Sequence, residues 1–91
     1  MSPAYEWDET KREANLVKHG VDFVDALEVF ADPLRVERVN QRREYAEERR
    51  EVVGMVRGQV LFVVYTLRRL ISARRASRNE RRAYYASSGR A

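Results

Sequence analysis

The sequence predicts a single α+β domain over residues 1–91, with a mainly antiparallel sheet of about four to five strands, two N-terminal helices and one C-terminal helix. Residues 60–65 are six consecutive apolar or aromatic residues, so both faces of this strand are apolar, which is typical of a central strand covered on both sides. Apolar residues before position 33 recur with helical spacing, whereas strand-like segments follow it. A chain of 91 residues is long enough for one domain with a small core.

Both N-terminal helices have recognisable ends. Asp8 is a suitable N-cap for a helix over residues 9–19, and Gly20 suits the left-handed residue that follows a helix. The second helix begins after Asp22 and ends at Asp32, because the proline that follows disfavours helical backbone in the residue before it. The apolar face of the second helix consists of residues with helical spacing, namely Phe23, Ala26, Leu27 and Phe30.

The strands are predicted from continuous or alternating apolar segments bounded by polar ones. Residues 40–50 are almost entirely polar and should form a long hairpin loop. Arg57-Gly58 should form one turn and residues 67–69 another. The expected strands cover residues 4–7, 34–39, 51–56, 60–66 and 70–75.

The C-terminal helix has a sequence signature at its start. Ser77 and Glu80 have the spacing of a capping box, in which each side chain accepts a hydrogen bond from the backbone of the other residue. This pattern predicts a helix that ends at about Ala86. Residues 87–91 should form a flexible tail.

Arginines gather where the last strand meets this helix. Side chains alternate along a strand, so Ser72 and Arg74 share one face and Arg75 points to the other. The helix N-terminus adds backbone N–H groups that favour a phosphate. We therefore expect a phosphate-binding site beside the helix start, formed by Arg74, Arg75 and Arg78, and Arg74 is also a candidate catalytic residue. The alternative is a solvated basic surface on which Ser77 only caps the helix.

The charge is divided between the two parts of the chain. Residues 1–32 contain eight acidic and three basic residues, a net charge of −5, whereas residues 33–91 have a net charge of +9. Sixteen of the 18 basic residues are arginine, which suits forked contacts with phosphate, so a polyanionic partner is expected on the C-terminal part. The chain has no cysteine, which excludes disulfides and thiolate metal sites, and it has no membrane-length apolar segment. A cytoplasmic protein without a cofactor or metal site is expected.

Four further residues are candidates for catalysis or phosphate binding. His19 has an unperturbed pKa near neutrality and is the natural acid or base, although a histidine in the last helical turn, like Lys18 beside it, also favours the helix dipole. Tyr65 could orient a base or act as an acid, although an aromatic residue on a central strand is more often part of the core. Arg57 and Lys18 could bind phosphate, or Arg57 could simply be a turn residue.

Tyr84 and Tyr85 are candidates for contact with a partner protein. Adjacent helical residues point about 100° apart, so the two rings cannot both be buried on one stripe. We expect at least one of them to face a partner.

Several motifs together resemble the BrnT family of toxins. The matching segments lie in order along nearly the whole chain, and the segments at 15–20 and 71–84 together are specific, whereas the one at 6–8 alone would not be. These segments are E-W-D at 6–8, N-L-x-K-H-G at 15–20, V-F-x-D-P at 29–33, V-V-Y-T at 63–66 and I-S-A-R-R-A-S-R-x-E-R-R-A-Y at 71–84. The chain departs from the family pattern at residues 67–69, where members usually have a longer polar turn.

The resemblance implies a RelE-like ribonuclease fold and metal-independent endoribonuclease activity that inhibits translation. It implies neutralisation by a BrnA-like ribbon-helix-helix antitoxin, with the toxin dimeric in the complex and bound to operator DNA only through the antitoxin. The antitoxin would contact Tyr84 or Tyr85. Two alternatives remain open at this point, since charge alone supports a nucleic-acid-binding module without catalysis, or a basic surface that binds only the antitoxin.

Overall fold

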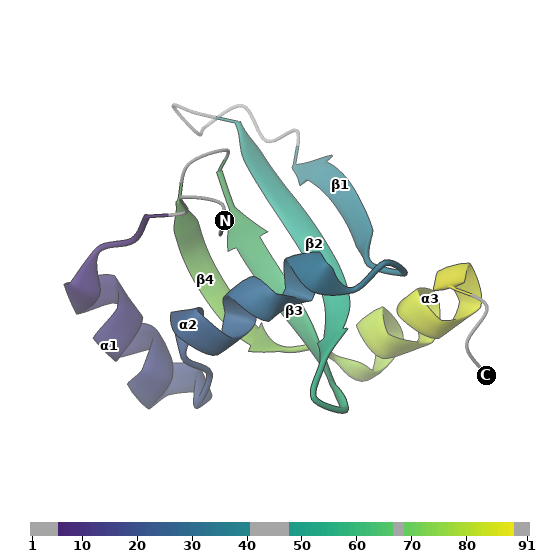
Figure 1. Ribbon diagram of the computed structural model, residues 1–91, viewed down its shortest axis with the longest axis horizontal. Helices are drawn as coiled ribbons and strands as arrows, with labels where there is room; N and C mark the ends of the chain where they lie inside the picture. The colour runs from purple at the N-terminus through teal and green to yellow at the C-terminus, as the bar shows by residue number, and fades with distance from the viewer. Residues whose placement is uncertain (1–5, 41–47, 67–68, 89–91) are drawn as a thin grey trace.

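The computed structural model describes residues 6–40, 48–66 and 69–88 (Figure 1). Four strands form one sheet in the order β1-β2-β3-β4, and all three neighbouring pairs are antiparallel. This arrangement confirms the predicted α+β class. In chain order the elements are α1 (Glu9–His19), α2 (Phe23–Ala26), the 3-10 helix η1 (Leu27–Ala31), β1 (Val36–Asn40), β2 (Arg49–Val56), β3 (Gln59–Tyr65), β4 (Leu70–Arg75) and α3 (Arg78–Ser88).

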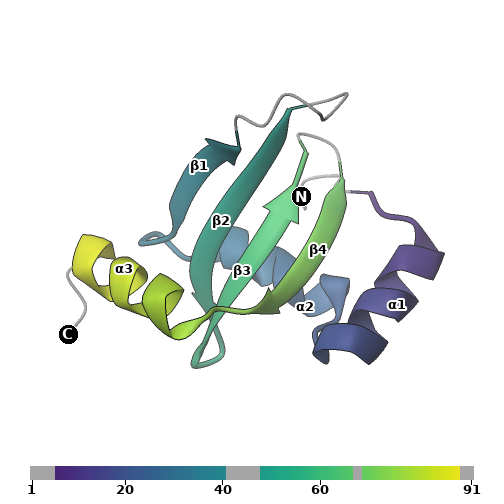
Figure 2. The ribbon, with the colours of Figure 1, turned by 180° about the vertical axis from the view of Figure 1, so that it is seen from behind.

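The helices divide unevenly between the two faces of the sheet. Helices α2 and η1 cross one face, α1 lies beside β4, and α3 packs at one end of the opposite face (Figures 1 and 2). As predicted, β3 is an interior strand with two apolar faces. Leu61, Val63 and Tyr65 join the larger core cluster under α2 and η1, whereas Val60 joins the smaller cluster that Tyr84 of α3 completes.

The side-chain amide of Asn15 fixes α1 against the edge of the sheet. Its Nδ2 donates to the Ala73 carbonyl at 2.8 Å, and its Oδ1 accepts from the Ala73 N–H at 3.1 Å, so one side chain satisfies both backbone groups at that edge. The predicted caps of α1 are also present. Asp8 accepts a hydrogen bond from the Thr10 N–H, and Gly20 has a φ of 71° in the left-handed region.

Asp32 connects three elements after η1. Its carboxylate accepts hydrogen bonds from the backbone N–H groups of Leu34 and Met55 and from the hydroxyl of Tyr84. The residue is buried, and these donors satisfy a charge that burial would otherwise destabilise. Gly54 of β2 lets η1 approach closely, because a Cβ at this position would lie 2.6 Å from the Val29 Cγ2 atom.

Several predicted boundaries differ from the structure. Strand β1 begins at Val36 rather than residue 34, and β2 begins at Arg49, inside the predicted loop over residues 40–50. Helix α3 continues to Ser88, so the first two residues of the expected tail are helical. Of the expected strand over residues 4–7, Glu6 forms one isolated bridge with Arg69, and residues 1–5 lie outside the described part.

The remaining loop predictions are only partly described. Residues 41–47 of the expected hairpin loop, residues 67–68 of the expected turn and residues 89–91 of the tail lie outside the described part. The turn at Arg57-Gly58 is confirmed, with both residues at positive φ. Over the residues that the structure describes, no helix is long and apolar enough to cross a membrane.

Candidate nucleic-acid interface

The sheet face opposite α2 and η1 is covered by α3 only at one end (Figure 2). The antiparallel registers place its side chains in rows across the strands. One row contains Val36, Val53, Phe62 and Arg74, and the next contains Arg38, Glu51, Val64 and Ser72. As predicted, Ser72 and Arg74 share this face, while Ala73 lies in the core on the other side.

Arg74 is held rigidly on this face by α3. Its two terminal nitrogens donate to the two carboxylate oxygens of Glu80 at 2.7 and 2.8 Å, and its guanidinium lies 4.2 Å from the centre of the Phe62 ring. Glu80 is itself fixed by the predicted capping box, in which it accepts from the Ser77 N–H and Ser77 Oγ accepts from the Glu80 N–H. The ion pair with Arg74 lowers the pKa of Glu80. The charge of Arg74 is therefore compensated within the fold.

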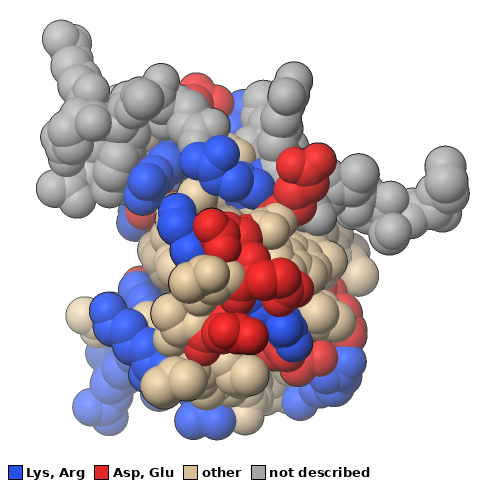
Figure 3. All heavy atoms as spheres, turned by 90° about the vertical axis from the view of Figure 1, so that its left-hand side faces the viewer, with Lys and Arg blue, Asp and Glu red and all other residues tan. Residues whose placement is uncertain are grey.

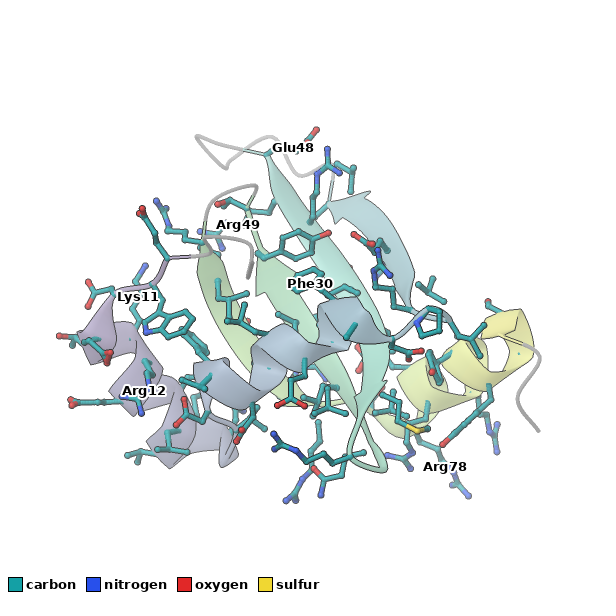
Figure 4. The ribbon with its side chains drawn as sticks, in the orientation of Figure 1. Lys11, Arg12, Phe30, Glu48, Arg49 and Arg78 are labelled. Carbon is teal, nitrogen blue, oxygen red and sulfur yellow. The ribbon has the colours of Figure 1, made fainter. Side chains whose placement is uncertain are left out.

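Four arginines beside Arg74 have no such compensation. None of them forms an ion pair with any residue in the described ranges, and all four side chains are exposed. Arg81 is oriented by a hydrogen bond to the Ala76 carbonyl at 3.0 Å, and Arg78 points away from the sheet at the start of α3 (Figure 4). The group, called the junction arginines below, consists of Arg75, Arg78, Arg81 and Arg82. Sequence reasoning missed Arg81 and Arg82, although the helical spacing of Arg78 and Arg82 could have indicated a shared face.

A shallow groove separates α3 from the sheet on the Arg74 side. Its lining includes Val36, Phe62 and Ala83, together with the polar residues Arg38 and Glu51, and its volume is about 130 Å³. The carboxylate of Glu51 accepts from Nε of Arg38 at 2.6 Å. Sequence analysis did not identify Glu51, because a lone carboxylate in a strand shows no motif.

His19 and Lys18 line a second cleft at the outer edge of β4. This open cleft between α1 and β4 has a volume of about 300 Å³, and Lys11, Ile71 and Ser72 also line it. Because Ser72 shares a face with Arg74, the cleft opens beside the same side of the sheet. Arg74 is not among the residues that line the cleft, so the structure brings His19 near this face but not into contact with the arginine.

The charge seen from the α1 side follows the division in the sequence. Figure 3 shows a band of acidic side chains down the middle of this view, with basic side chains above it and toward the lower left and lower right. Arg12 of α1 is neutralised within the acidic band, because it pairs with both Glu9 and Asp22.

Two of the predicted site residues lie elsewhere. Tyr65 is only 2% exposed, packs edge-to-face against Phe30 and donates a hydrogen bond to Glu37 on the helix-covered face, opposite to Arg74. Figure 4 shows Phe30 between η1 and the sheet. Tyr65 therefore faces away from Arg74 and belongs to the core, which is the alternative that its place on a central strand favours. Arg57 forms ion pairs with Asp25 and Glu28, so its guanidinium, a candidate for phosphate binding, already contacts acidic side chains.

The two adjacent tyrosines of α3 differ in burial. Tyr84 is 1% exposed and donates a hydrogen bond from its hydroxyl to Asp32, so this candidate for contact with a partner offers no surface to one. Tyr85 is half-buried and meets Tyr84 edge-to-face, with ring centres 5.4 Å apart. Only Tyr85 of this pair could contact another molecule.

The described residues contain no group of three or more His, Asp or Glu side chains placed to hold a metal ion. The site consists instead of a rigid arginine on an open sheet face, a cluster of uncompensated arginines at one end of β4, and an imidazole at the outer edge of that strand. Such an arrangement suits a ribose-phosphate chain, because several cations can contact successive phosphates.

Comparison with known proteins agrees with this reading of the geometry. A family model described as the ribonuclease toxin, BrnT, of type II toxin-antitoxin systems matches residues 7–80. No curated protein matches the chain with significant similarity. The family match covers well over half of the 91 residues and includes both α1 and the start of α3. The chain therefore belongs to the BrnT family of ribonuclease toxins of type II toxin–antitoxin systems.

Proposed function

We propose that this toxin is a metal-independent endoribonuclease that cleaves RNA bound across the β4–α3 junction. The observation that carries the proposal is the group of junction arginines, which have no ion-pair partner among the described residues and lie next to the fixed Arg74. Arg12 and Arg57, by contrast, are paired with acidic side chains. Four arginines without such partners, gathered at the end of β4 and the first turns of α3, favour binding of a polyanion.

The proposed reaction needs no activated water. The ribose 2′-oxygen loses its proton to a base and attacks the adjacent phosphorus, while the bond from phosphorus to the 5′-oxygen breaks and that oxygen takes a proton. The products are a cyclic phosphate and a free 5′-hydroxyl. Negative charge develops on the phosphoryl oxygens in the transition state, and guanidinium groups stabilise that charge.

Each candidate residue then has a distinct role. Arg75 and Arg78, together with Arg81 and Arg82, bind the phosphates. Arg74 acts as a positioning residue, because its bidentate pair with Glu80 connects β4 to the start of α3. His19 serves as acid or base from the cleft at the β4 edge, with Lys18 beside it for a flanking phosphate.

The biological setting belongs to the same proposal. Cleavage of RNA would inhibit translation in the cytoplasm, and a BrnA-like ribbon-helix-helix antitoxin would neutralise the toxin. The complex, with two toxin copies, would repress its own operon through DNA contacts made by the antitoxin. Tyr85 is the residue proposed to face the antitoxin or another ligand, because the neighbouring Tyr84 is buried.

The test compares variants of matched charge in the presence of a chelator. Purified protein should cleave RNA with EDTA present, and the double variant Arg75→Ala/Arg78→Ala should cleave at least about tenfold more slowly. Arg35→Ala/Arg50→Ala is the control, because it removes the same charge from two arginines that are already paired, with Glu37 and Glu48. His19→Gln should alter the pH profile of cleavage, because it removes the proposed acid or base. Intact RNA after incubation with folded protein would contradict the proposal.

One observation favours a second candidate, a nucleic-acid-binding module without catalysis. The charge of Arg74 is already compensated by Glu80, and His19 does not contact it. This alternative expects salt-dependent RNA binding that is weakened by loss of the junction arginines, with no cleavage product at any pH.

A further inference from the structure

A second pocket lies on the other side of α3 from the Arg74 groove. The turn between β2 and β3, the end of β4 and the first turns of α3 line an open pocket of about 350 Å³. Its lining includes Gln59, Val60, Arg75, Ala76, Arg81 and Tyr85. The volume lies at the lower end of the range found for small-molecule pockets, roughly 300–1,000 Å³.

The lining combines three kinds of chemistry. Val60 and Ala76 are buried and form an apolar floor, which the ring of Tyr85 extends. Two junction arginines, Arg75 and Arg81, provide cationic donors, and Arg81 is fixed at the rim by its hydrogen bond to Ala76. Gln59 is exposed and its amide can both donate and accept.

The sign of the charge separates this pocket from the groove on the opposite side of α3. Two carboxylates, Glu51 and Glu80, line that groove, whereas none of the described residues that line the pocket is acidic. An aromatic ring beside two arginines suits a group that is planar at one end and anionic at the other. A nucleotide has this form, with a base that stacks on the ring and a phosphate that accepts from guanidinium groups.

We propose that this pocket binds one nucleotide of single-stranded RNA, with its base against Tyr85, its phosphate between Arg75 and Arg81, and its base edge toward Gln59. The inference rests on the proposed function and adds a substrate class to it. A base can reach the tyrosine ring only when it is unstacked, which occurs in single strands and loops but not in a duplex. The toxin should therefore select single-stranded RNA.

The experiment measures binding separately from cleavage. Fluorescence anisotropy at fixed salt compares a labelled single-stranded RNA with a perfect duplex of the same length, with both RNAs carrying 2′-deoxy sugars or 2′-O-methyl groups that prevent attack. Tyr85→Leu keeps apolar volume but removes the ring, and it should weaken single-strand binding about 5- to 100-fold while leaving duplex binding nearly unchanged. Tyr85→Phe keeps the ring and should bind like the original protein.

A second measurement does not depend on how well a variant folds. RNA containing 5-iodouridine is irradiated in complex with the unmodified protein, and the crosslinked peptide should contain Tyr85.

Gln59→Ala should change the relative affinities for homopolymers of different bases rather than lower all of them equally.

The outcomes separate this inference from the proposed function. Equal single-strand affinity of Tyr85→Leu and the original protein, with crosslinks elsewhere, would overturn the nucleotide pocket even if the protein cleaves RNA. Loss of single-strand binding in Tyr85→Leu, in a protein that never cleaves RNA, would support the pocket and reject the nuclease.

Discussion

At the scale of single residues, Asn15 shows how one side chain can replace a neighbouring strand. Its amide has the same donor and acceptor as a peptide group, and it meets both backbone groups of Ala73 at the outer edge of β4. Nδ2 also donates to the Val21 carbonyl, so the same residue fixes the chain that leaves α1. The cleft that holds His19 and Lys18 therefore depends on a buried amide one turn away.

Replacing Asn15 should destabilise the fold more than its size suggests. Asn15→Ala leaves the N–H and carbonyl of Ala73 without a partner, and a buried unsatisfied group costs about 1–3 kcal/mol. Urea unfolding followed by circular dichroism measures the loss. The exposed neighbour Glu13→Ala is the matched control, and its free energy of unfolding should change by no more than about 0.5 kcal/mol. Equal stability of the two variants would show that the edge amide is not a structural requirement.

Tyr65 gives a residue-scale test of the division between the two sheet faces. Tyr65→Phe keeps the ring packed on Phe30 but removes the hydrogen bond to Glu37, so it should lower the free energy of unfolding by about 0.5–1.5 kcal/mol. RNA cleavage per folded molecule should be unchanged, because the hydroxyl faces away from Arg74. If Tyr65→Phe had normal stability but did not cleave RNA, the Tyr65 hydroxyl would have to take part in catalysis.

At the scale of elements, the start of α3 combines a helix cap with an ion pair. Glu80 closes the capping box with Ser77 and also pairs with Arg74 across the corner between β4 and α3. The pair with Arg74 is the main reason that the pKa of Glu80 is lowered from its ordinary value of 4.5. The folded state therefore favours the ionised carboxylate of Glu80. Its contribution to the free energy of unfolding is fully present above pH 4.5, the ordinary pKa, and is lost as the pH falls through the lowered pKa of the folded state.

This linkage predicts a measurable pH effect. The free energy of unfolding should fall as the pH drops below about 4.5, and Glu80→Gln should be less stable at pH 7 but show a smaller fall. The variants are compared by urea unfolding at several pH values. Glu13→Gln, at an exposed position, should retain the pH dependence of the original protein. An unchanged slope in Glu80→Gln would mean that other carboxylates account for the acid sensitivity.

The elements themselves were largely predictable, because local signals specify them. Asp8 and Gly20 define α1, the Ser77–Glu80 pair defines the start of α3, and continuous apolar residues define β3. The start of β2 at Arg49 was missed, since its first residues are charged and a strand there depends on pairing with β1 and β3 rather than on its own sequence. The N-terminal boundary of β2 is therefore set by pairing with its neighbouring strands and not by local propensity.

The site was predictable only in part, for a related reason. The alternation of faces correctly separated Arg74 from Arg75, because it follows from strand geometry alone. An arginine lacks an ion-pair partner when no acidic side chain lies close to it in the fold, and such acidic residues can be far away in the sequence. Arg57 meets Asp25 and Glu28 about thirty positions earlier, and no local pattern reveals such a pair.

At the scale of the whole molecule, folding distributes the net charge of +4 unevenly. Acidic residues of the N-terminal part meet arginines within their own segment or from the β2–β3 turn, as with Arg12 and Arg57. The junction arginines have no such partners among the described residues. Within the described part of the chain, four arginines without ion-pair partners therefore lie at one corner, and the interaction with a polyanion should depend on that corner rather than on total charge.

Salt dependence tests this consequence of the fold. For single-stranded nucleic acid, the logarithm of the binding constant falls with the logarithm of salt concentration by about 0.7 for each phosphate neutralised. Arg78→Gln/Arg82→Gln should reduce the magnitude of this slope by up to about 1.4, because both residues would neutralise phosphates. Arg35→Gln/Arg50→Gln is the matched control, since it removes the same charge from arginines already paired with Glu37 and Glu48. Its slope should stay near that of the original protein. Equal slopes in the two double variants would show that RNA responds to net charge alone, so that the uncompensated corner has no special part in binding.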